Sequence, residues 1–186
     1  EKSAIMLKCF DLTGQTAIVT GASKGLGEGF AHALAQSGAD LFLAARHPEG
    51  LQRVADEIRA AYGVRCHWCA ADIAKPGDPD RIAAACTDVY GKIDILVNNA
   101  AAMRNNKPPQ QTTPEEFEAV MYPNVIGTYA LCRAVGEVMR RQKKGKIVNI
   151  SSMSALIVNR GVYGGSYEVS KAAVAMLTKT LAVEWA

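Results

Sequence analysis

The sequence lacks the features that mark several large classes of protein. No apolar stretch approaches the ~20 residues that a membrane-spanning helix needs. The first residues show no charged part leading into an apolar part and a small-residue cleavage site. Neither sign of charge dominates, because 21 Lys and Arg oppose 18 Asp and Glu, and a short basic run at residues 140–144 is predicted to be a solvated helix end. We therefore expect a soluble, cytoplasmic protein that binds neither nucleic acid nor membrane.

Cysteine is too scarce and too scattered for a disulfide framework or a zinc site. The 5 cysteines form an odd, dispersed set, namely Cys9, Cys66, Cys69, Cys86 and Cys132. A chain of 186 residues can bury a core without covalent cross-links, so reduced thiols are expected. The segment Cys66-His67-Trp68-Cys69 has no second ligand pair at a spacing suitable for zinc. In an extended strand its two cysteines face opposite ways, so we predict buried apolar cysteines and no metal site.

What the sequence does have is a regular alternation of short apolar segments and helical patterns. Hydrophobic residues make up 49% of the chain and charged residues 21%, so residues 1–186 are predicted to form a single domain with a substantial core. Apolar runs predict strands at residues 16–20, 41–45, 64–70, 93–98 and 146–151. Helical spacing predicts helices at residues 25–37, from about 48, at 78–90, from 114 towards 141, and at about 165–186.

The order of these elements predicts the fold class. Short, nearly all-apolar strands that alternate with helices favour a Rossmann-like α/β fold, a doubly wound parallel sheet with helices on both faces in three layers. One helix should begin at a capping box, because Thr113, Pro114 and Glu116 have the required types and spacing. In such sheets ligands bind at the carboxyl ends of the strands, where the winding changes direction. The candidate motifs all fall at one of those ends.

The first of these motifs is the glycine-rich turn between the first strand and the first helix. Backbone N–H groups and the helix dipole at such a turn can receive the pyrophosphate of a dinucleotide. Gly21 would permit the turn, Gly25 would let the backbone approach the phosphate, and Gly27 would let the helix pack closely on the strand. A tight strand–helix turn without a ligand is the alternative. The predicted cofactor contacts in this turn are Gly21, Ser23, Lys24, Gly25, Leu26 and Gly27.

The end of the second strand indicates which nicotinamide cofactor is bound. An acidic residue there would accept hydrogen bonds from the adenosine ribose of NAD, but the run is Ala44-Ala45-Arg46-His47. Arg46 instead offers a forked cation to a 2′-phosphate, and Lys24 can add a second charge nearby. Each could also be a solvated surface base. Together they predict NADP(H) rather than NAD(H).

The last predicted helix carries a pair of residues suited to proton transfer. Tyr167 and Lys171 are four residues apart, which places them on one helix face, one turn from each other. An ordinary tyrosine has a pKa near 10 and is a poor acid or base at neutral pH unless a cation stabilises its phenolate. Lys171 can supply that cation, so that Tyr167 exchanges a proton with a carbonyl or alcohol oxygen. Alone, this spacing is common by chance.

Taken together, the motifs resemble the short-chain dehydrogenase/reductase family. The match runs in order over essentially the whole chain, which makes it far more specific than any single motif. It rests on the glycine turn at residues 20–27, on Asn98-Asn99-Ala100-Ala101, on Asn124, on Ser151-Ser152, and on Tyr167 with Lys171. The resemblance implies reversible hydride transfer between a nicotinamide and a small carbonyl or alcohol substrate.

The resemblance also implies roles for the matched residues of the reaction centre. Tyr167 would be the proton donor or acceptor, while Lys171 would lower its pKa and hold the nicotinamide ribose. Ser152 would hydrogen-bond the substrate oxygen and steady its developing charge. Ser154 is the rival, since it lies 13 residues before the tyrosine, a frequent spacing in the family. We prefer Ser152, because the end of the strand fixes its place.

Asn124 resembles the helix asparagine that holds a water in a proton relay behind the lysine. The alternative is a residue at a helix kink, because Pro123 directly before it cannot donate the helical hydrogen bond. The resemblance places Asn124 with Ser152, Tyr167 and Lys171 among the catalytic residues.

Other matched positions surround the cofactor. Asp72 and Ile73 resemble the pair that meets adenine, and Asn98 resembles the residue that supports the sheet beside the cofactor. Ala100 follows Asn98 in the same cofactor-binding segment. Ala101 stands where the family usually has glycine, and its added methyl group puts that contact with the cofactor in doubt.

Family members continue beyond the point where this sequence stops. They add another strand, a substrate-binding segment and a final strand, so we expect a longer chain in which these C-terminal strands follow. Without them the fifth strand would be a bare sheet edge. The resemblance also implies a homotetramer that packs through the helix of residues 113–141 and the final helix. Val125, Tyr129, Val174 and Leu177 fit this, although ordinary core packing would explain them equally well.

The substrate is indicated by a short segment before the tyrosine. Ser151-Ser152-Met153-Ser154 and Ile157-Val158-Asn159 look more like sugar-acid and polyol members of the family, such as gluconate 5-dehydrogenase-like and mannitol or sorbose reductase-like proteins. A ketose, keto-sugar acid or polyol is therefore expected. Two alternatives are a 3-oxoacyl-[acyl-carrier-protein] reductase and a regulator that senses NADP(H) without catalysis.

Overall fold

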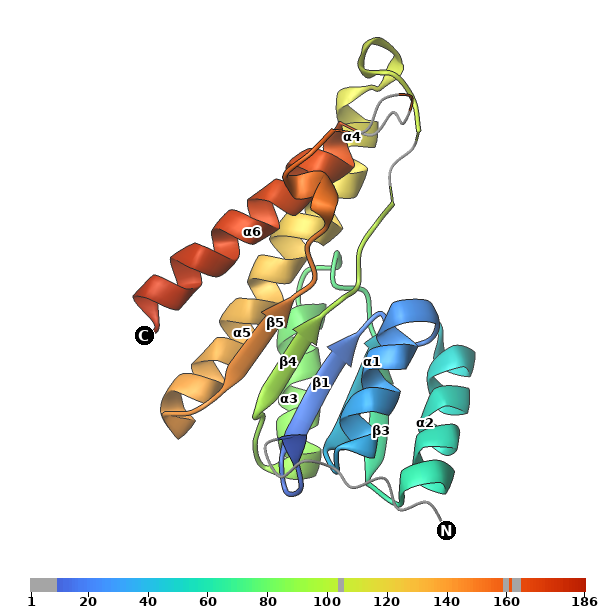
Figure 1. The fold of residues 1–186 in the computed structure, drawn as a ribbon, viewed down its shortest axis with the longest axis vertical. Helices are drawn as coiled ribbons and strands as arrows, with labels where there is room; N and C mark the ends of the chain where they lie inside the picture. Colours follow the sequence, from blue (N-terminus) through green and yellow to red (C-terminus); the bar gives the residue numbers. More distant parts are fainter. Residues whose placement is uncertain (1–9, 104–105, 159–160, 162–164) are drawn as a thin grey trace.

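Five parallel β-strands form the centre of the molecule (Figure 1). The computed structural model describes residues 10–103, 106–158, 161 and 165–186, so Cys9 and Asn159 lie outside the described residues. The strands are β1 (Thr16–Thr20), β2 (Asp40–Ala45), β3 (Cys66–Ala70), β4 (Ile95–Asn98) and β5 (Lys146–Asn149). Their order in the sheet is β3-β2-β1-β4-β5, so the winding reverses between β1 and β4. The predicted doubly wound α/β sheet is confirmed.

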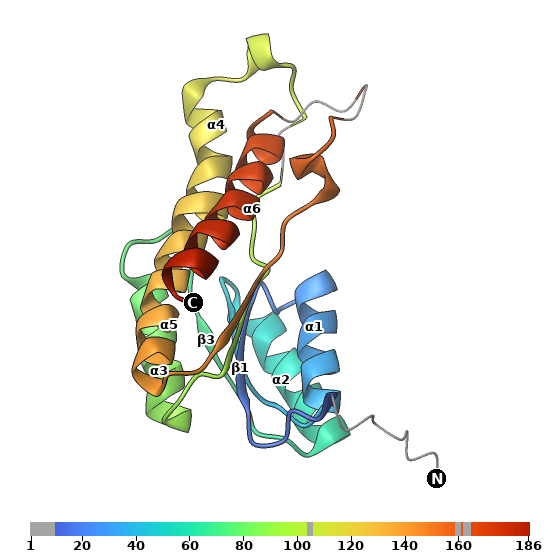
Figure 2. The ribbon, with the colours of Figure 1, turned by 60° about the vertical axis from the view of Figure 1, so that its left-hand side comes forward.

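Helices cover both faces of the sheet, as Figure 2 shows. The helices α1 (Gly25–Gln36) and α2 (Pro48–Tyr62) lie on one face. The helices α3 (Asp78–Tyr90), α5 (Thr128–Gln142) and α6 (Ser166–Glu184) lie on the other. Successive side chains of β1 point to opposite faces of the sheet. Ala17 and Val19 pack towards α1 and α2, whereas Ile18 packs towards α3 and α5. The three layers therefore have two separate apolar cores.

The helix predicted from residue 114 towards 141 is interrupted by one wider turn. It begins as α4 (Pro114–Met121), with the predicted capping box formed by Thr113 and Glu116. Residues Tyr122–Gly127 then form a π-helical turn before α5 begins. Pro123 has no N–H to donate to the preceding turn, and wider turns of this kind often lie at functional sites. The helix therefore runs over the expected residues, with a widened turn beside Pro123, where a kink at Asn124 was the alternative expectation.

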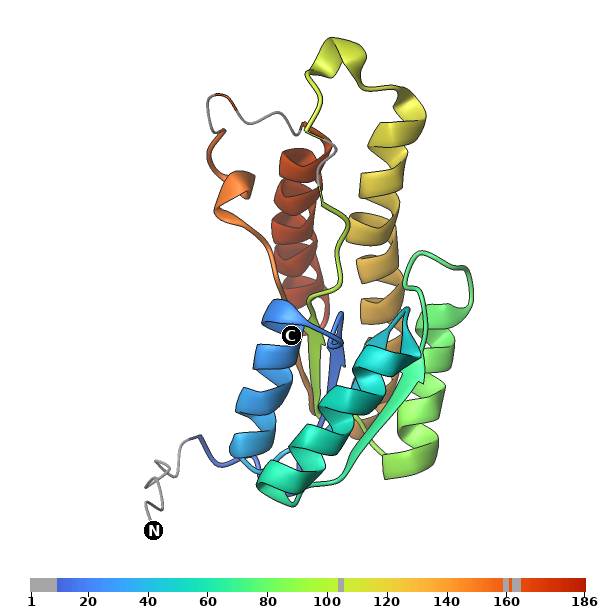
Figure 3. The same ribbon diagram turned by 90° about the vertical axis from the view of Figure 1, so that its right-hand side faces the viewer.

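The upper part of the molecule consists of elements that extend past the sheet. Figure 3 shows α4 and the first turns of α6 standing beyond the carboxyl ends of the strands. Two short 3₁₀ turns, Pro109–Gln111 and Met153–Ala155, lie in the connections that reach this region. The predicted site residues of the last helix therefore lie above the sheet edge where the strands end.

Among the described strands β5 lies at one edge of the sheet, as expected, and β3 lies at the other. In the described residues β5 pairs with β4 alone, in the register Val97↔Val148 and Asn98↔Asn149. Val148 is 47% exposed, which is high for an apolar residue in a strand. Among the described helices, none is long and apolar enough to cross a lipid bilayer.

The described cysteines are unpaired and mostly buried. Cys66 packs with the core under α1 and α2, whereas Cys69 packs on the opposite face, as the strand period predicts. Burial raises the pKa of the Cys66 and Cys86 thiols to about 12 and that of Cys132 to about 11. These thiols are therefore protonated, inert core groups at neutral pH.

Two glycines of α1 provide a matched test of how closely this helix packs. A Cβ atom on Gly27 would lie 2.2 Å from the Gly21 carbonyl oxygen, whereas one on Gly29 would meet nothing within 4 Å. We expect Gly27→Ala to lower the free energy of unfolding by about 1–3 kcal/mol, because the backbone must shift. Gly29→Ala should raise it by about 0.5–1 kcal/mol. Urea unfolding measures both, and equal effects would contradict the close packing of Gly27.

Candidate active site

The predicted site residues lie on segments that follow the ends of the strands. The glycine turn follows β1, Arg46 follows β2 and Asp72 follows β3. Asn98 ends β4, and Ser152 comes three residues after the end of β5. Because all five strands are parallel, these segments emerge at one edge of the sheet. The sheet thus gathers positions that are far apart in the sequence.

The backbone of the glycine turn has open space beside it. Gly21 and Gly25 have positive φ angles of 65° and 62°, which favour glycine. A Cβ on Gly25 would meet nothing within 4 Å, so this part of the backbone faces open space. Lys24, the N-cap of α1, makes no side-chain capping hydrogen bond, which leaves the start of the helix open to an anion. These features fit the pyrophosphate of a dinucleotide.

The glycine turn is tied to β4 by two residues whose roles the sequence did not reveal. The Thr20 hydroxyl oxygen accepts hydrogen bonds from the backbone N–H groups of Asn99 at 3.0 Å and Ala100 at 3.1 Å. The Asn99 side-chain amide donates to the Thr20 carbonyl oxygen at 3.0 Å. These bonds fix the turn across the point where the winding reverses. Thr20 and Asn99 both belong to the sequence motifs. Their contacts could not be predicted from those motifs, because they join segments almost eighty residues apart.

The positions predicted for the adenosine end of the cofactor lie around the neighbouring strand ends. Arg46 and Lys24 are both exposed, and Leu26 is 70% exposed at the start of α1. The Asp72 carboxylate accepts a hydrogen bond from the backbone N–H of Ala74 at 3.0 Å, which shapes the segment after β3. Ile73 is nearly buried. Two exposed cations and one acidic segment therefore follow the ends of β1, β2 and β3.

Asn98 is engaged inside the protein. It is buried, and its side-chain amide donates to the Asn149 side-chain oxygen at 2.9 Å and to the Cys132 sulfur at 3.2 Å. Asn149 in turn donates to the Thr178 hydroxyl of α6 at 2.9 Å. Asn98 thus links β4, β5 and, through Asn149, α6, which is the sheet-supporting part of its predicted role. Its amide is not directed at a ligand.

Tyr167 and Lys171 lie in the first two turns of α6. The Lys171 ammonium nitrogen is 5.7 Å from the centre of the Tyr167 ring and donates a hydrogen bond to the Ile150 carbonyl oxygen at 2.7 Å. Lys171 is 4% exposed, and burial lowers its pKa. The Ser151 hydroxyl donates to the Lys171 carbonyl oxygen at 2.8 Å. The helix start is therefore bound to the segment that follows β5.

Asn124 connects this helix to the segment after β4. It is 1% exposed, and its side-chain oxygen accepts from the Ala102 backbone N–H at 2.6 Å. Its amide donates to the Ala102 carbonyl and to the Ser170 hydroxyl, each at 3.0 Å. The Ser170 hydroxyl then donates to the Tyr167 carbonyl at 2.7 Å. Ser170 was not predicted as a site residue. Its position in the sequence between Tyr167 and Lys171 is the signal that could have identified it.

The two candidate serines occupy different positions in the turn after β5. The Ser152 hydroxyl oxygen accepts a hydrogen bond from the Ser154 backbone N–H at 3.1 Å, so Ser152 caps the short 3₁₀ turn. Ser152 is half-buried, whereas Ser154 is 6% exposed. A partly accessible hydroxyl can reach a substrate more readily than a buried one.

Ala101, at the position where the resembled family has glycine, is exposed.

Known proteins are similar to this chain in sequence and in fold. The family profile described as "short chain dehydrogenase" matches residues 15–186. The galactitol 2-dehydrogenase (L-tagatose-forming) of Cereibacter sphaeroides is 40% identical over 177 residues, which cover 95% of this chain and 68% of that protein.

Solved structures extend the similarity to the fold. The L-sorbose reductase of Gluconobacter frateurii, complexed with NADPH and L-sorbose, matches with a TM-score of 0.89 at 31% identity, over 94% of this chain and 65% of that one. An NAD+-bound xylitol dehydrogenase matches with a TM-score of 0.88 at 29% identity, over 94% of this chain and 66% of that one. The chain thus spans about two thirds of the length of these proteins.

The buried ammonium of Lys171 should make stability depend on pH. Burial lowers its pKa below the usual value of 10.5, so between the two pKa values the unfolded chain binds more protons than the folded one. The free energy of unfolding should therefore rise as the pH approaches 10.5, and this rise should be smaller in Lys171→Met. Chemical denaturation of both proteins at several alkaline pH values measures it. A difference that stays constant with pH would contradict the lowered pKa.

Proposed function

The chain belongs to the short-chain dehydrogenase/reductase family of oxidoreductases, and on that premise we propose that it is an NADP(H)-dependent reductase. The reaction is reversible hydride transfer between the nicotinamide and a carbonyl or secondary alcohol of a sugar or polyol. One observation carries the proposal. The buried Lys171 ammonium lies 5.7 Å from the Tyr167 ring at the start of α6, beside the ends of the strands.

The residues of the chain handle the proton in this proposal. In reduction, the Tyr167 hydroxyl gives its proton to the carbonyl oxygen as that oxygen gains negative charge. The Lys171 ammonium stabilises the resulting phenolate, because opposite charges in a poorly hydrated site attract strongly. The Ser152 hydroxyl donates a hydrogen bond to the same substrate oxygen. Oxidation of the alcohol reverses these steps.

Asn124 has a supporting role in the proposal. Both N–H groups of its side-chain amide are used, by the Ala102 carbonyl and the Ser170 hydroxyl, and its side-chain oxygen accepts from the Ala102 N–H. In the proposal a water held behind Lys171 meets the Asn124 backbone carbonyl, since the π-helical turn disturbs the regular backbone pairing there.

The bound nicotinamide supplies or accepts the hydride, and the protein supplies position and charge. The open backbone at Gly25 and the start of α1 would hold the pyrophosphate. The exposed cations Arg46 and Lys24 would hold the 2′-phosphate. The relatives include both an NADPH complex and an NAD+ complex, so the preference for NADP(H) rests on these two cations.

The names of similar proteins support a sugar or polyol as substrate. They include an enzyme named for galactitol and L-tagatose and a structure that holds L-sorbose. This agrees with the sugar-acid and polyol character of the segment that precedes Tyr167.

Exposed apolar residues support the proposed homotetramer. Tyr122, Ile126 and Tyr129 are 44–48% exposed and lie on one face of the helix that runs from α4 to α5. On α6, Val169, Met176 and Val183 recur every seven residues and are 48–81% exposed. Val174 is 2% exposed and belongs to the core of a single chain. Two apolar faces are thus available to symmetry mates.

Removing the Tyr167 hydroxyl should abolish proton transfer but leave the cofactor site intact. We expect Tyr167→Phe to lower kcat by about 10²–10⁴-fold with an unchanged Kd for NADPH. The assay uses NADPH with ketoses, keto-gluconates, acyl thioesters and quinones. Preference for acyl thioesters would replace the sugar proposal with the acyl-carrier-protein reductase. NADPH binding without turnover of any substrate would favour a sensor.

Reversing the charge of Arg46 should change the choice of cofactor. We expect Arg46→Asp to raise the ratio of NADPH Kd to NADH Kd at least about tenfold, because a carboxylate repels the 2′-phosphate and accepts from ribose hydroxyls. Arg141→Asp, at the far end of α5, serves as a control for the change in net charge. Equal binding of NADH and NADPH by the unaltered protein would refute the proposed role of Arg46.

A further inference from the structure

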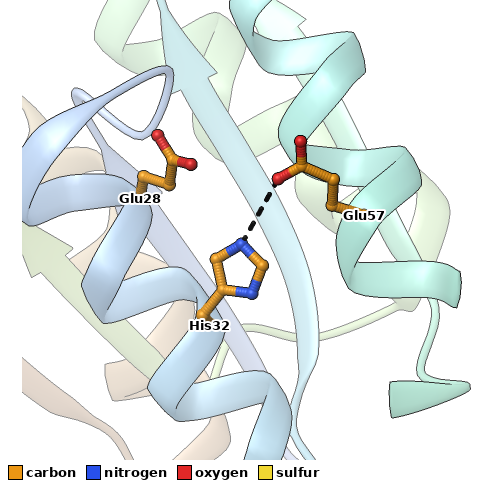
Figure 4. Close-up of side chains that lie close together, drawn as sticks. All are labelled: Glu28, His32 and Glu57. Carbon is orange, nitrogen blue, oxygen red and sulfur yellow. Dashed lines mark ion pairs between the residues drawn. The ribbon is translucent and has the colours of Figure 1, made fainter. Parts of the chain in front are cut away.

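A cluster of ionisable side chains lies between α1 and α2, close to the glycine turn. Figure 4 shows Glu28 and His32 extending from α1 and Glu57 from α2. The His32 ring nitrogen lies 3.8 Å from the Glu57 carboxylate. Ligand atoms of the three residues lie within 4.8 Å of one another, which is the arrangement of a possible metal site.

Arg53 already supplies the positive charge in this cluster. Its guanidinium donates to both Glu28 oxygens at 3.0 and 2.9 Å and to both Glu57 oxygens at 2.9 and 3.0 Å. These bonds hold the pKa of the Glu28 carboxyl below its usual value. This planar guanidinium already binds two of the three groups that a divalent cation would need.

The first two turns of α2 are in close contact with the glycine turn. The Arg53 guanidinium also reaches the Ser23 carbonyl oxygen at 3.4 Å. One turn earlier, a Cβ on Gly50 would lie 2.9 Å from the Ser23 Cβ, so the two backbones are in close contact. Ser23 is therefore held from one side by the first two turns of α2.

Glu28 lies where its negative charge would oppose a bound phosphate unless Arg53 offsets it. Glu28 lies in the first turn of α1, at the end where the helix dipole attracts phosphate. An uncompensated carboxylate there would oppose a pyrophosphate, and it would oppose NADPH more than NADH because of the additional phosphate. Glu57 would add to this repulsion.

We propose that Arg53 is a positioning residue for the phosphate-binding turn: it holds Ser23 in place and offsets part of the negative charge of Glu28 and Glu57. The inference rests on the proposed function, because it takes the glycine turn to bind NADP(H). It adds a residue outside the family motifs to the determinants of cofactor affinity. Arg53 acts through its neighbours and does not contact the cofactor.

Cofactor titrations of five proteins test the inference. The Kd values of NADPH and NADH are measured by fluorescence for the unaltered full chain and for Arg53→Met, Glu28→Gln, the Arg53→Met/Glu28→Gln double variant and Arg59→Met. Arg59 is the matched control, because it lies on the same helix with one ion pair and one backbone carbonyl partner but far from the glycine turn.

We expect Arg53→Met to weaken NADPH about fivefold or more and NADH less, with the loss shrinking at high salt. The double variant should recover much of the lost affinity, because the opposing carboxylate is gone. Arg59→Met and Glu28→Gln should stay within about twofold of the unaltered protein.

The outcomes separate the inference from the proposed function. If the unaltered chain binds no NADPH, the proposed function fails. If it binds NADPH and Arg53→Met binds equally well, the inference is overturned. Equal losses in Arg53→Met and Arg59→Met would also overturn it, because they would reflect a general loss of structure. If the double variant bound NADPH as weakly as Arg53→Met does, the proposed charge compensation by Arg53 would be refuted.

Discussion

The hydrogen bonds of the Asn124 side chain hold the parts of the site in one arrangement. They join the segment after β4, through Ala102, to α6, through Ser170. Asn124 can make them because the helix widens into a π turn next to Pro123. A buried amide cannot replace lost partners with water, so a shift of either segment would leave polar groups unsatisfied. The spacing between the strand ends and Tyr167 therefore depends on this side chain together with the bonds of Ser151 and Lys171, which tie α6 to the segment after β5.

Much of the fold follows from local patterns in the sequence. Apolar runs and glycine turns located all five strands, because strand and turn preferences act over a few residues. Strand ends depend on pairing and were less well predicted. Ile150 still donates its backbone N–H to the Asn98 carbonyl at 2.9 Å, yet β5 ends at Asn149 because the chain then turns into the 3₁₀ segment. The π turn depends on packing, since a Cβ on Gly127 would lie 2.6 Å from the Ile73 carbonyl.

The candidate site was also predictable only where its features are local in the sequence. Its motif residues could be named from the sequence, because the glycine turn and the tyrosine–lysine spacing are local. The residues that hold them could not be named. Thr20, Ser170 and Arg53 act through partners 25 to 80 residues away, and no short pattern records such contacts. Asn98 was expected to support the sheet, but the partner it uses, Asn149 on the neighbouring strand, could not be named from the sequence.

The bond between Lys171 and the Ile150 carbonyl has a consequence for the proposed reaction. An ammonium group has three N–H donors, and this bond uses one of them. The remaining two are enough for a ribose hydroxyl and a phenolate oxygen. The carbonyl can therefore act as a fixed anchor while the other partners arrive and leave. The lysine would keep one rotamer through the catalytic cycle, and the site would not need to reorganise its charge at each round.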